Sequence, residues 1–270
     1  MITFPNCKIN LGLHILRKRE DGFHNLATVF YPVKLPDALE IINDKGDSIT
    51  YSQSGLVIEG KPEDNLCIRA YHLLKKDHPQ LPGIRMHLHK NIPMGAGLGG
   101  GSSDAAFVLK MLNEKYVLGL SQQQLLQYSL SLGSDAPFFV INKPCYATGR
   151  GEILEEISID LCGYSILLVN PGIHVSTAWA FAQLTLNNER PSLKDIISQP
   201  VDAWKQELQN DFEKPVFEKY PQIRSIKEEL YAKGAVYAAM SGSGSTVFGL
   251  FSGKPGNRLF TDSYFEHWVH

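Results

Sequence analysis

Apolar residues occupy every second position from Ile9 to Ile15, and polar or small residues stand between them. A repeat of two residues predicts a β-strand with one buried face. Side chains at every second position of a strand share a face, so Lys8 and Asn10 are expected to lie together on the opposite face.

Similar patterns predict the remaining elements. Strands are expected at residues 26–34, 38–43, 48–51, 56–58, 84–89, 138–141, 145–148, 164–169, 235–240 and 246–251. Helices are expected at 66–76, from Ser102 onward, at 121–132, 175–186, 201–209 and 222–233. Ser102 or Ser103 is the expected cap of its helix, with Asp104 in an acidic first turn. Residues 134–137 are a predicted turn because of Pro137, and 187–200 are predicted to be irregular.

The order of elements starts again near residue 156. A chain of 270 residues can hold one large domain or two ordinary ones. We therefore expect two domains, residues 1–155 and 156–270.

Composition narrows the class of protein. The net charge of -2 provides no strong field that would recruit nucleic acid or an anionic membrane surface. The longest aliphatic run, Ile166–Val169, is too short to cross a bilayer, and the first residues do not resemble a signal peptide. The cysteines Cys7, Cys67, Cys145 and Cys162 form no CxxC pair, which favours reduced, mostly buried thiols in a cytoplasmic protein. Cys7, beside Lys8, is either a small apolar filler or a reactive thiol.

A glycine-rich segment carries the strongest local signal. It consists of Pro93, Met94, Gly95, Ala96, Gly97, Leu98, Gly99, Gly100, Gly101, Ser102 and Ser103. Glycines allow backbone N–H groups to approach an anion closely, and the predicted helix behind them adds aligned donors. No lysine follows as in a P-loop, and no convincing βαβ unit surrounds the segment as in a dinucleotide fold. The alternatives are a phosphate-binding loop or a flexible connection.

Several segments together resemble a known family. Pro93–Ser103 resembles the phosphate-binding signature of the GHMP kinases. Within that superfamily, Asn6–Leu11, Asp21–Leu26 and Gly133–Phe138 resemble motifs of the 4-diphosphocytidyl-2-C-methyl-D-erythritol kinases. Asn210–Glu213 and Met240–Ser245 resemble later landmarks of the same family. The matches follow in order along nearly the whole chain.

The resemblance implies a two-domain α+β fold, with an N-terminal domain like domain 2 of ribosomal protein S5 and a ferredoxin-like C-terminal domain. It implies ATP-dependent phosphorylation of the 2-hydroxyl of a cytidylyl sugar alcohol, in the non-mevalonate route to isoprenoid precursors. The two substrates are expected to meet in a cleft between the domains. Mg²⁺ is expected on ATP oxygens, water and Ser103, because the sequence has no dedicated carboxylate cage. The protein is expected to be a monomer or weak homodimer without nucleic-acid or membrane partners.

Two residues carry the expected catalysis. By resemblance, Asp135 accepts or orients the proton of the hydroxyl, and Lys8 neutralises charge on the nascent alkoxide and the γ-phosphate. Taken alone, Asp135 is a turn aspartate and Lys8 a solvated strand lysine, so their roles depend on the joint resemblance.

The expected substrate-binding residues also follow from the resemblance: Asn10, Phe23, His24, Phe30, Thr177 and Phe181. His24 reads cytosine, and Phe23 and Phe181 stack on it. Phe23 stands where the family usually has tyrosine, which preserves an aromatic face and removes a hydroxyl. Core packing is the alternative for Phe30 and Phe181, and an exposed turn is the alternative for His24.

Other assignments stay open. Asn65 and Lys90 fall near the adenine side in the family, or are simply polar surface residues. Ser241–Ser245 resembles the third GHMP motif, or is an ordinary hairpin turn. The alternative functions are another GHMP kinase, acting on a sugar or a mevalonate-type acid, and a nucleotide sensor without catalysis.

Overall fold

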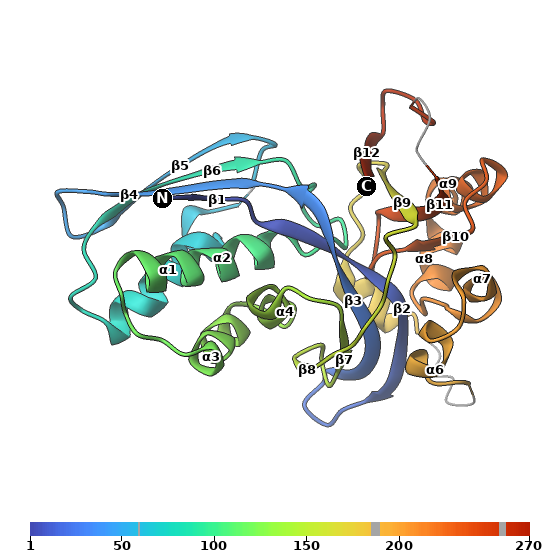
Figure 1. Cartoon of the computed structure of the whole chain (residues 1–270), viewed down its shortest axis with the longest axis horizontal. Coiled ribbons are helices and arrows are strands. Elements are labelled where there is room, and N and C mark those ends of the chain that lie inside the picture. The colour runs from blue at the N-terminus through green and yellow to red at the C-terminus, as the bar shows by residue number, and fades with distance from the viewer. Residues whose placement is uncertain (59, 185–189, 254–257) are drawn as a thin grey trace. The chain divides into compact units, whose positions relative to one another are not determined.

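The computed structural model describes residues 1–58, 60–184, 190–253 and 258–270. The chain forms two compact units, and each unit is assembled from segments that are distant in sequence (Figure 1). Unit 1 contains Met1–Cys7, Leu35–Met94 and Gly99–Lys143, and unit 2 contains Lys8–Lys34, Gly95–Leu98 and Pro144–His270. The domain boundary near residue 155 stays a prediction.

Unit 1 contains a four-stranded sheet in the order β1-β4-β6-β5. Its strands are β1 (Ile2–Thr3), β4 (Ala38–Asn43), β6 (Ile84–Lys90) and β5 (Ile49–Gly55), and β5 is parallel to β6. Burial alternates along β6, since Ile84, Met86 and Leu88 are buried and the residues between them are more exposed. The apolar face is therefore the one that the helices of unit 1 cover (Figure 1).

The helices of unit 1 are α1 (Leu66–Asp77), α2 (Gly100–Lys115), α3 (Gln122–Leu132) and α4 (Ala136–Ile141), and a short 3₁₀ turn at Pro62–Asp64 precedes α1. Side chains define two of the starts. The Asn65 carboxamide oxygen accepts a hydrogen bond from the Cys67 N–H at 2.9 Å. Ser121 and Gln124 form a reciprocal capping box at the start of α3.

Unit 2 holds two further sheets. One has the order β2-β3-β7-β8, formed by β2 (Asn6–Lys18), β3 (His24–Pro36), β7 (Cys145–Thr148) and β8 (Ile153–Glu156). The other has the order β10-β11-β9-β12, formed by β10 (Tyr237–Met240), β11 (Val247–Ser252), β9 (Tyr164–Asn170) and β12 (Phe265–Val269), with antiparallel pairs throughout.

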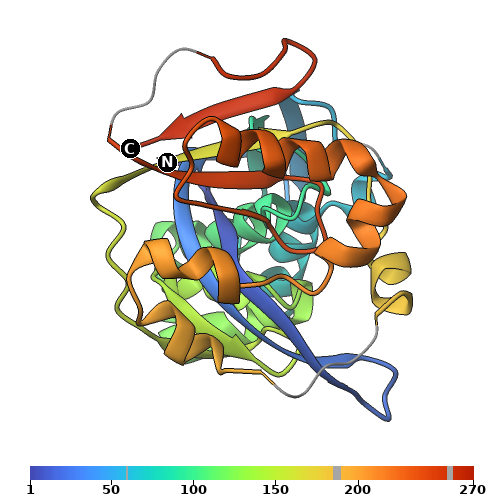
Figure 2. The ribbon, with the colours of Figure 1, turned by 90° about the vertical axis from the view of Figure 1, so that its right-hand side faces the viewer.

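The helices of unit 2 are short except for the last. They are α5 (Thr177–Ala182), α6 (Leu193–Ile197), a 3₁₀ turn at Val201–Ala203, α7 (Trp204–Glu207), α8 (Glu213–Lys219) and α9 (Pro221–Ala232). α9 packs along β10 and β11 (Figure 2). The core beneath it includes Ile223, Ile226 and Leu230 from α9 with Leu167 and Val247 from the sheet.

Most predicted elements are confirmed, and the corrections have local causes. Residues 138–141 belong to α4 and not to a strand, because Pro137 lies in the first turn, where a helix does not need its N–H. Residues 56–58 form no strand, and α6 lies inside the segment predicted to be irregular. α5 ends at Ala182, and the end of its predicted range, 185–186, lies outside the described residues.

Two other expectations were wrong in detail. β2 is buried on both faces from Cys7 to Ile15, whereas one buried face was expected. α2 begins at Gly100 after Gly99, so neither Ser102 nor Ser103 caps it and its first turn has no acidic residue.

All four cysteines are free thiols, and three of them are buried while Cys162 is exposed. Among the described residues, no helix is long and apolar enough to cross a membrane.

A buried ion cluster joins three elements of unit 1. Lys90, at the end of β6, is fully buried, and its ammonium contacts the carboxylates of Asp37 and Asp104. The second oxygen of Asp37 accepts hydrogen bonds from the N–H groups of Asn91 and Ile92 at 2.5 and 2.8 Å. Burial raises the pKa of Asp104 to about 7, and the Lys90 charge opposes that rise. Lys90 is thus a structural cation in the interior and not the polar surface residue that the sequence also allowed.

Replacing Lys90 by methionine tests this cluster. Lys90→Met leaves two buried carboxylates without their cation, so we expect the free energy of unfolding at pH 7 to fall by about 3–5 kcal/mol. The Lys90 charge opposes the rise in the pKa of Asp104, so Lys90→Met raises this folded-state pKa further, and protonation restores more stability to the variant than to wild type. The difference from wild type should therefore shrink as the pH falls from 8 to 5.

Urea unfolding at several pH values measures this difference. Lys76→Met, at an exposed lysine of α1, is the control and should stay within about 0.5 kcal/mol of wild type. An equal loss in both variants, or a loss that does not depend on pH, would contradict the cluster's role.

Candidate active site

The predicted pair Lys8 and Asn10 is at the centre of a buried network in unit 2. The Lys8 ammonium donates to the Asn10 carboxamide oxygen at 2.6 Å and to the Gly97 carbonyl at 3.2 Å. The Asn10 Nδ2 group donates to the Thr28 hydroxyl at 2.9 Å, and Thr28 donates to the Gly12 carbonyl at 2.6 Å. Lys8 is only 3% exposed, so polar groups such as the Asn10 carboxamide and the Gly97 carbonyl replace the water that its charge would otherwise require.

The Ser241–Ser245 segment lies against the part of the glycine loop that belongs to unit 2. The Ser241 hydroxyl donates to the Gly97 carbonyl at 2.8 Å and accepts from the Asn10 N–H at 3.2 Å. A Cβ atom on Gly97 would stand 2.0 Å from the Ser241 carbonyl oxygen, and Gly97 has a φ of +78°. Glycine is required here because two backbones meet, which supports a close-packed GHMP motif over an ordinary hairpin turn.

Predicted base-binding rings lie together in the same unit. His24 and Phe181 are stacked with their ring centroids 4.9 Å apart and an interplanar angle of 18°. Burial, with help from Lys18, lowers the pKa of His24, so its ring is neutral near pH 7 and offers one donor and one acceptor. Phe23 is 53% exposed, and the Arg150 guanidinium lies 4.4 Å from its ring centroid.

The remaining predicted substrate residues occupy different environments. Phe30 is buried, and the Lys8 ammonium lies 5.0 Å from the centre of its ring. Thr177 is exposed at the start of α5, with its hydroxyl 2.9 Å from that of Ser243. Phe30 therefore offers the face of its ring to the Lys8 ammonium, while Thr177 is accessible to a ligand.

The rest of the glycine loop belongs to unit 1, where it leads into α2. Gly99 has a φ of +71° and stands at the cap position without a side-chain hydrogen bond. The first N–H groups of a helix have no partner inside it, so Gly100, Gly101 and Ser102 present amides at this end. A positive helix terminus of this kind suits a phosphate group.

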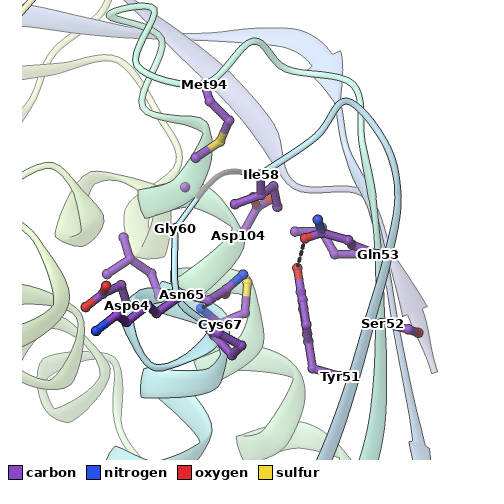
Figure 3. Close-up of a pocket in the computed structure, with 15 residues that line it drawn as sticks. Tyr51, Ser52, Gln53, Ile58, Gly60, Asp64, Asn65, Cys67, Met94 and Asp104 are labelled. Atoms are coloured by element: carbon purple, nitrogen blue, oxygen red, sulfur yellow. Dashed lines mark hydrogen bonds between the residues drawn. The ribbon is translucent and has the colours of Figure 1, made fainter.

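A pocket of about 300 Å³ lies beside this helix start, within unit 1 (Figure 3). Tyr51 and Gln53 line it from β5, Asn65 and Cys67 from the start of α1, and Asp104 from α2. Met94 and Gly101 also line it, which places the pocket next to the glycine loop. Burial raises the pKa of the Tyr51 phenol and of the Cys67 thiol, so both are neutral. The pocket has the size and polarity for a flat heterocycle whose phosphates reach the loop.

Two buried polar atoms near the loop have no hydrogen-bond partner among the described residues. They are the Ser103 hydroxyl and the Oδ1 atom of Asp104. A hydroxyl in the first turns of α2 fits a contact with a phosphate oxygen or with Mg²⁺ carried by ATP. The described part of the chain contains no group of three or more His, Cys, Asp or Glu residues that could hold a metal.

Asp135 lies in unit 1, directly before α4, and is partly exposed. Its carboxylate does not cap α4. Lys8 belongs to unit 2, so the convergence of these two residues stays a prediction.

Sequence reasoning missed several residues that the structure brings to these sites. Thr28 supports Asn10 from the neighbouring strand, Arg150 lies against Phe23, and Tyr51 lines the pocket. None belongs to a motif that we recognised. Thr28 carries a weak signal, since it is a polar residue inside an apolar strand pattern.

Comparisons with known proteins agree with this geometry. The family described as GHMP kinases N terminal domain matches residues 65–143, and GHMP kinases C terminal matches residues 192–261. A protein of Bacteroides fragilis named 4-diphosphocytidyl-2-C-methyl-D-erythritol kinase is 56% identical over 254 residues, which cover 93% of this chain and 92% of that protein. The chain belongs to this kinase family.

Other members give the same result. A protein of the same name from Azobacteroides pseudotrichonymphae is 50% identical over 268 residues, or 99% of each chain. A crystal structure of 4-(cytidine 5'-diphospho)-2C-methyl-D-erythritol kinase aligns with a TM-score of 0.81 and 32% identity, over 93% of this chain and 90% of that one. The predicted α+β GHMP kinase fold is thereby confirmed.

The unpaired hydroxyl of Ser103 leads to a test in which stability and binding change in opposite directions. Ser103→Ala removes a buried polar group that lacks a partner, so the free energy of unfolding without nucleotide should rise by up to about 1 kcal/mol. The variant should also bind Mg²⁺–ATP about tenfold more weakly, a loss of about 1.4 kcal/mol. Chemical denaturation and titration calorimetry measure the two effects.

Ser129→Ala is the matched control. Ser129 is equally buried in unit 1, but its hydroxyl donates to the Leu126 carbonyl at 2.8 Å. This variant should lose stability and keep its affinity for Mg²⁺–ATP. Unchanged nucleotide affinity in Ser103→Ala would show that the hydroxyl makes no contact with the bound nucleotide or its ion.

Proposed function

We propose that the chain transfers the γ-phosphoryl group of ATP to the 2-hydroxyl of 4-diphosphocytidyl-2-C-methyl-D-erythritol. The observation that carries the proposal is the buried network of Lys8 and Asn10, which lies in the same unit as the His24–Phe181 ring pair. The network supplies a fixed positive charge, and the rings supply a surface for a flat base. The named relatives, similar over nearly the whole chain, support the choice of substrate.

Lys8 supplies a preorganised charge. Asn10 and the Gly97 carbonyl hold its ammonium in place, so little reorganisation is needed when negative charge develops on the acceptor oxygen and the γ-phosphate. Its burial also matters, because an electrostatic contact is stronger in a site from which water is excluded.

Asp135 is the group proposed to orient the hydroxyl and to take its proton. A carboxylate is suited to this step when it stays ionised within hydrogen-bond reach of the hydroxyl. Phosphoryl transfer requires this positioning more than it requires a strong base.

Cytosine recognition is assigned to the rings of Phe23, His24 and Phe181. The stacked His24 and Phe181 rings provide aromatic faces, and a neutral histidine can donate to or accept from the edge of the base. Phe23 contributes a face that is already in contact with the Arg150 guanidinium. Asn10, Phe30 and Thr177 are proposed around the sugar alcohol and the diphosphate.

The nucleotide is assigned to unit 1. Its base would occupy the pocket near Tyr51 and Asn65, and its phosphates would meet the amides of Gly100–Ser102. Mg²⁺ would neutralise phosphate charge during transfer, with Ser103 as the contributing side chain.

Further proposals concern the protein as a whole. We also propose a cytoplasmic location, supported by the four free cysteines, and a monomer or weak homodimer that binds no nucleic acid or membrane. The two-domain division near residue 155 also remains a proposal. The paired rings of His24 and Phe181 suit a cytidylyl group better than a small sugar or acid.

A panel of acceptors tests the proposed substrate. Purified protein with Mg²⁺–ATP should phosphorylate 4-diphosphocytidyl-2-C-methyl-D-erythritol and should show no turnover with mevalonate, homoserine or galactose. Phosphorus NMR of the product should place the new phosphate on the 2-hydroxyl. Turnover of another acceptor, with none of the cytidylyl alcohol, would refute the assignment.

Asp135→Asn tests the proposed base. The variant keeps the size of the side chain and loses its charge, so kcat should fall by about 10²–10⁴-fold. The Kd for Mg²⁺–ATP should stay within about threefold of wild type, since nucleotide contacts are assigned elsewhere in unit 1. Asp47→Asn, at an exposed turn residue, is the control and should keep full activity. Normal kcat in Asp135→Asn would remove its catalytic role.

A further inference from the structure

The segment Asn210–Glu213 matches a family landmark, yet none of its residues has an assigned role. It follows α7 and ends at Glu213, the first residue of α8, and its contacts lie within unit 2. Each of its four side chains contacts other parts of unit 2, and Asn210 and Glu213 share Met240 as a partner. Together these contacts reach the substrate residues assigned above.

Asn210 fixes the backbone on both sides of Ser241. Its side chain is 4% exposed, and both N–H bonds of Nδ2 are used, toward the Met240 carbonyl at 2.7 Å and the Gly242 carbonyl at 2.8 Å. Its Oδ1 atom accepts from the Phe212 N–H at 3.0 Å. The Asn210 carboxamide therefore has no N–H left to donate. By binding the carbonyls on both sides of Ser241, it fixes the residue whose hydroxyl contacts the Gly97 carbonyl and the Asn10 N–H.

Asp211 attaches the same segment to β2, the strand that carries Lys8 and Asn10. Its carboxylate accepts from the Ile15 N–H at 2.6 Å and forms a two-pronged ion pair with Arg190 at 2.5 and 2.6 Å. Its backbone N–H donates to the Leu13 carbonyl at 2.9 Å. Strand β2 and the Ser241–Ser245 segment are thus both held by hydrogen bonds to the same short segment, Asn210–Glu213.

Phe212 reaches the predicted base-binding rings. Its ring, 2% exposed, meets the ring of Phe181 edge-on, with centroids 4.9 Å apart and an interplanar angle of 89°. Phe181 in turn stacks on His24. An edge-to-face contact fixes the orientation of a ring as well as its position.

Glu213 completes the attachment. One carboxylate oxygen accepts from the Met240 N–H at 2.9 Å, and the other pairs with Lys227 of α9 at 2.7 Å. Met240 is therefore held through its N–H by Glu213 and through its carbonyl by Asn210. Two independent hydrogen bonds at one residue leave the start of the Ser241 loop little freedom to move.

From these contacts we infer that Asn210 and Phe212 are positioning residues for the reaction. Asn210 fixes the position of Ser241, which in turn supports the Lys8–Asn10 network. Phe212 fixes the orientation of the Phe181 ring, on which the base is proposed to stack. The inference rests on the proposed function, because it assigns the network to catalysis and the rings to substrate binding. A substitution of Asn210 should therefore change kcat, and a substitution of Phe212 should change the KM for the cytidylyl alcohol.

The test compares Asn210→Asp with Phe212→Leu. Asn210→Asp keeps the volume but turns oxygens toward two carbonyls, so Ser241 should shift and kcat should fall by at least about tenfold, as small misplacements of reacting groups do. The KM for the cytidylyl alcohol should stay within about threefold of wild type. Phe212→Leu should raise that KM by about tenfold, with kcat nearly unchanged, because it loosens binding of the base.

Two controls separate positioning from stability. Tyr237→Phe removes a buried hydrogen bond to the Leu208 carbonyl, two residues before Asn210, and Phe217→Leu removes a ring from the same core as Phe212. Both should lower the unfolding midpoint and leave kcat and KM unchanged. If all four variants change kcat and KM in proportion to their loss of stability, the segment is only structural and the inference is wrong.

Hydrogen exchange gives a readout that does not depend on turnover. In Asn210→Asp, backbone amides of residues 240–246 should exchange faster than in wild type, while Tyr237→Phe should leave them unchanged. If wild type fails to phosphorylate the cytidylyl alcohol, the proposed function falls, and unchanged exchange at 240–246 would overturn the inference separately. Should Asn210→Asp not fold, Asn210→Ser, which keeps one donor, is measured instead, with an intermediate loss of kcat expected.

Discussion

The buried ammonium of Lys8 sets the conditions for the rest of unit 2. A charged group that is 3% exposed needs partners that replace water, and here they are the Asn10 carboxamide, the Gly97 carbonyl and the face of the Phe30 ring. Each partner needs support in turn. Thr28 holds Asn10, and Ser241 holds both Asn10 and Gly97. Hydrogen bonds thus extend from one lysine through two strands, the glycine loop and the Ser241–Ser245 segment, so the local fold and the proposed chemistry depend on the same contacts.

Unit 1 meets a similar requirement in another way. Lys90 is fully buried, and the carboxylates of Asp37 and Asp104 neutralise its charge. The partners of Lys8 include the Asn10 carboxamide and the Gly97 carbonyl. The first arrangement suits a charge that stays inside and organises backbone, since Asp37 also binds the amides that precede the glycine loop. The second holds the ammonium of Lys8 in place, which suits a group proposed to act on phosphate.

More of the candidate site could be predicted from the sequence than of the residues that hold the site in place. Alternation along β2 placed Lys8 and Asn10 on one face, and the glycine spacing located the loop before α2. Both signals come from residues that are close in sequence, so they can be recognised without knowledge of the fold. The helix at Ala136–Ile141 was missed because a short apolar run fits a strand as well as a helix. The burial of Lys90 depends on which segments pack together, and a lysine at a strand end carries no trace of that. The roles within Asn210–Glu213 were hidden for the same reason, because their partners are as distant in sequence as Ile15 and Met240.

The pocket of unit 1 has one feature that bears on the choice of inhibitors. Asp104 lines it, and the Oδ1 atom of this buried carboxylate lacks a hydrogen-bond partner among the residues described. Compounds whose scaffold fills about 300 Å³ and offers an amine or amide N–H to that oxygen would satisfy an acceptor that the protein itself leaves unused. Scaffolds that present only acceptors there would leave that oxygen unpaired, so a fragment library for this pocket is best weighted toward hydrogen-bond donors.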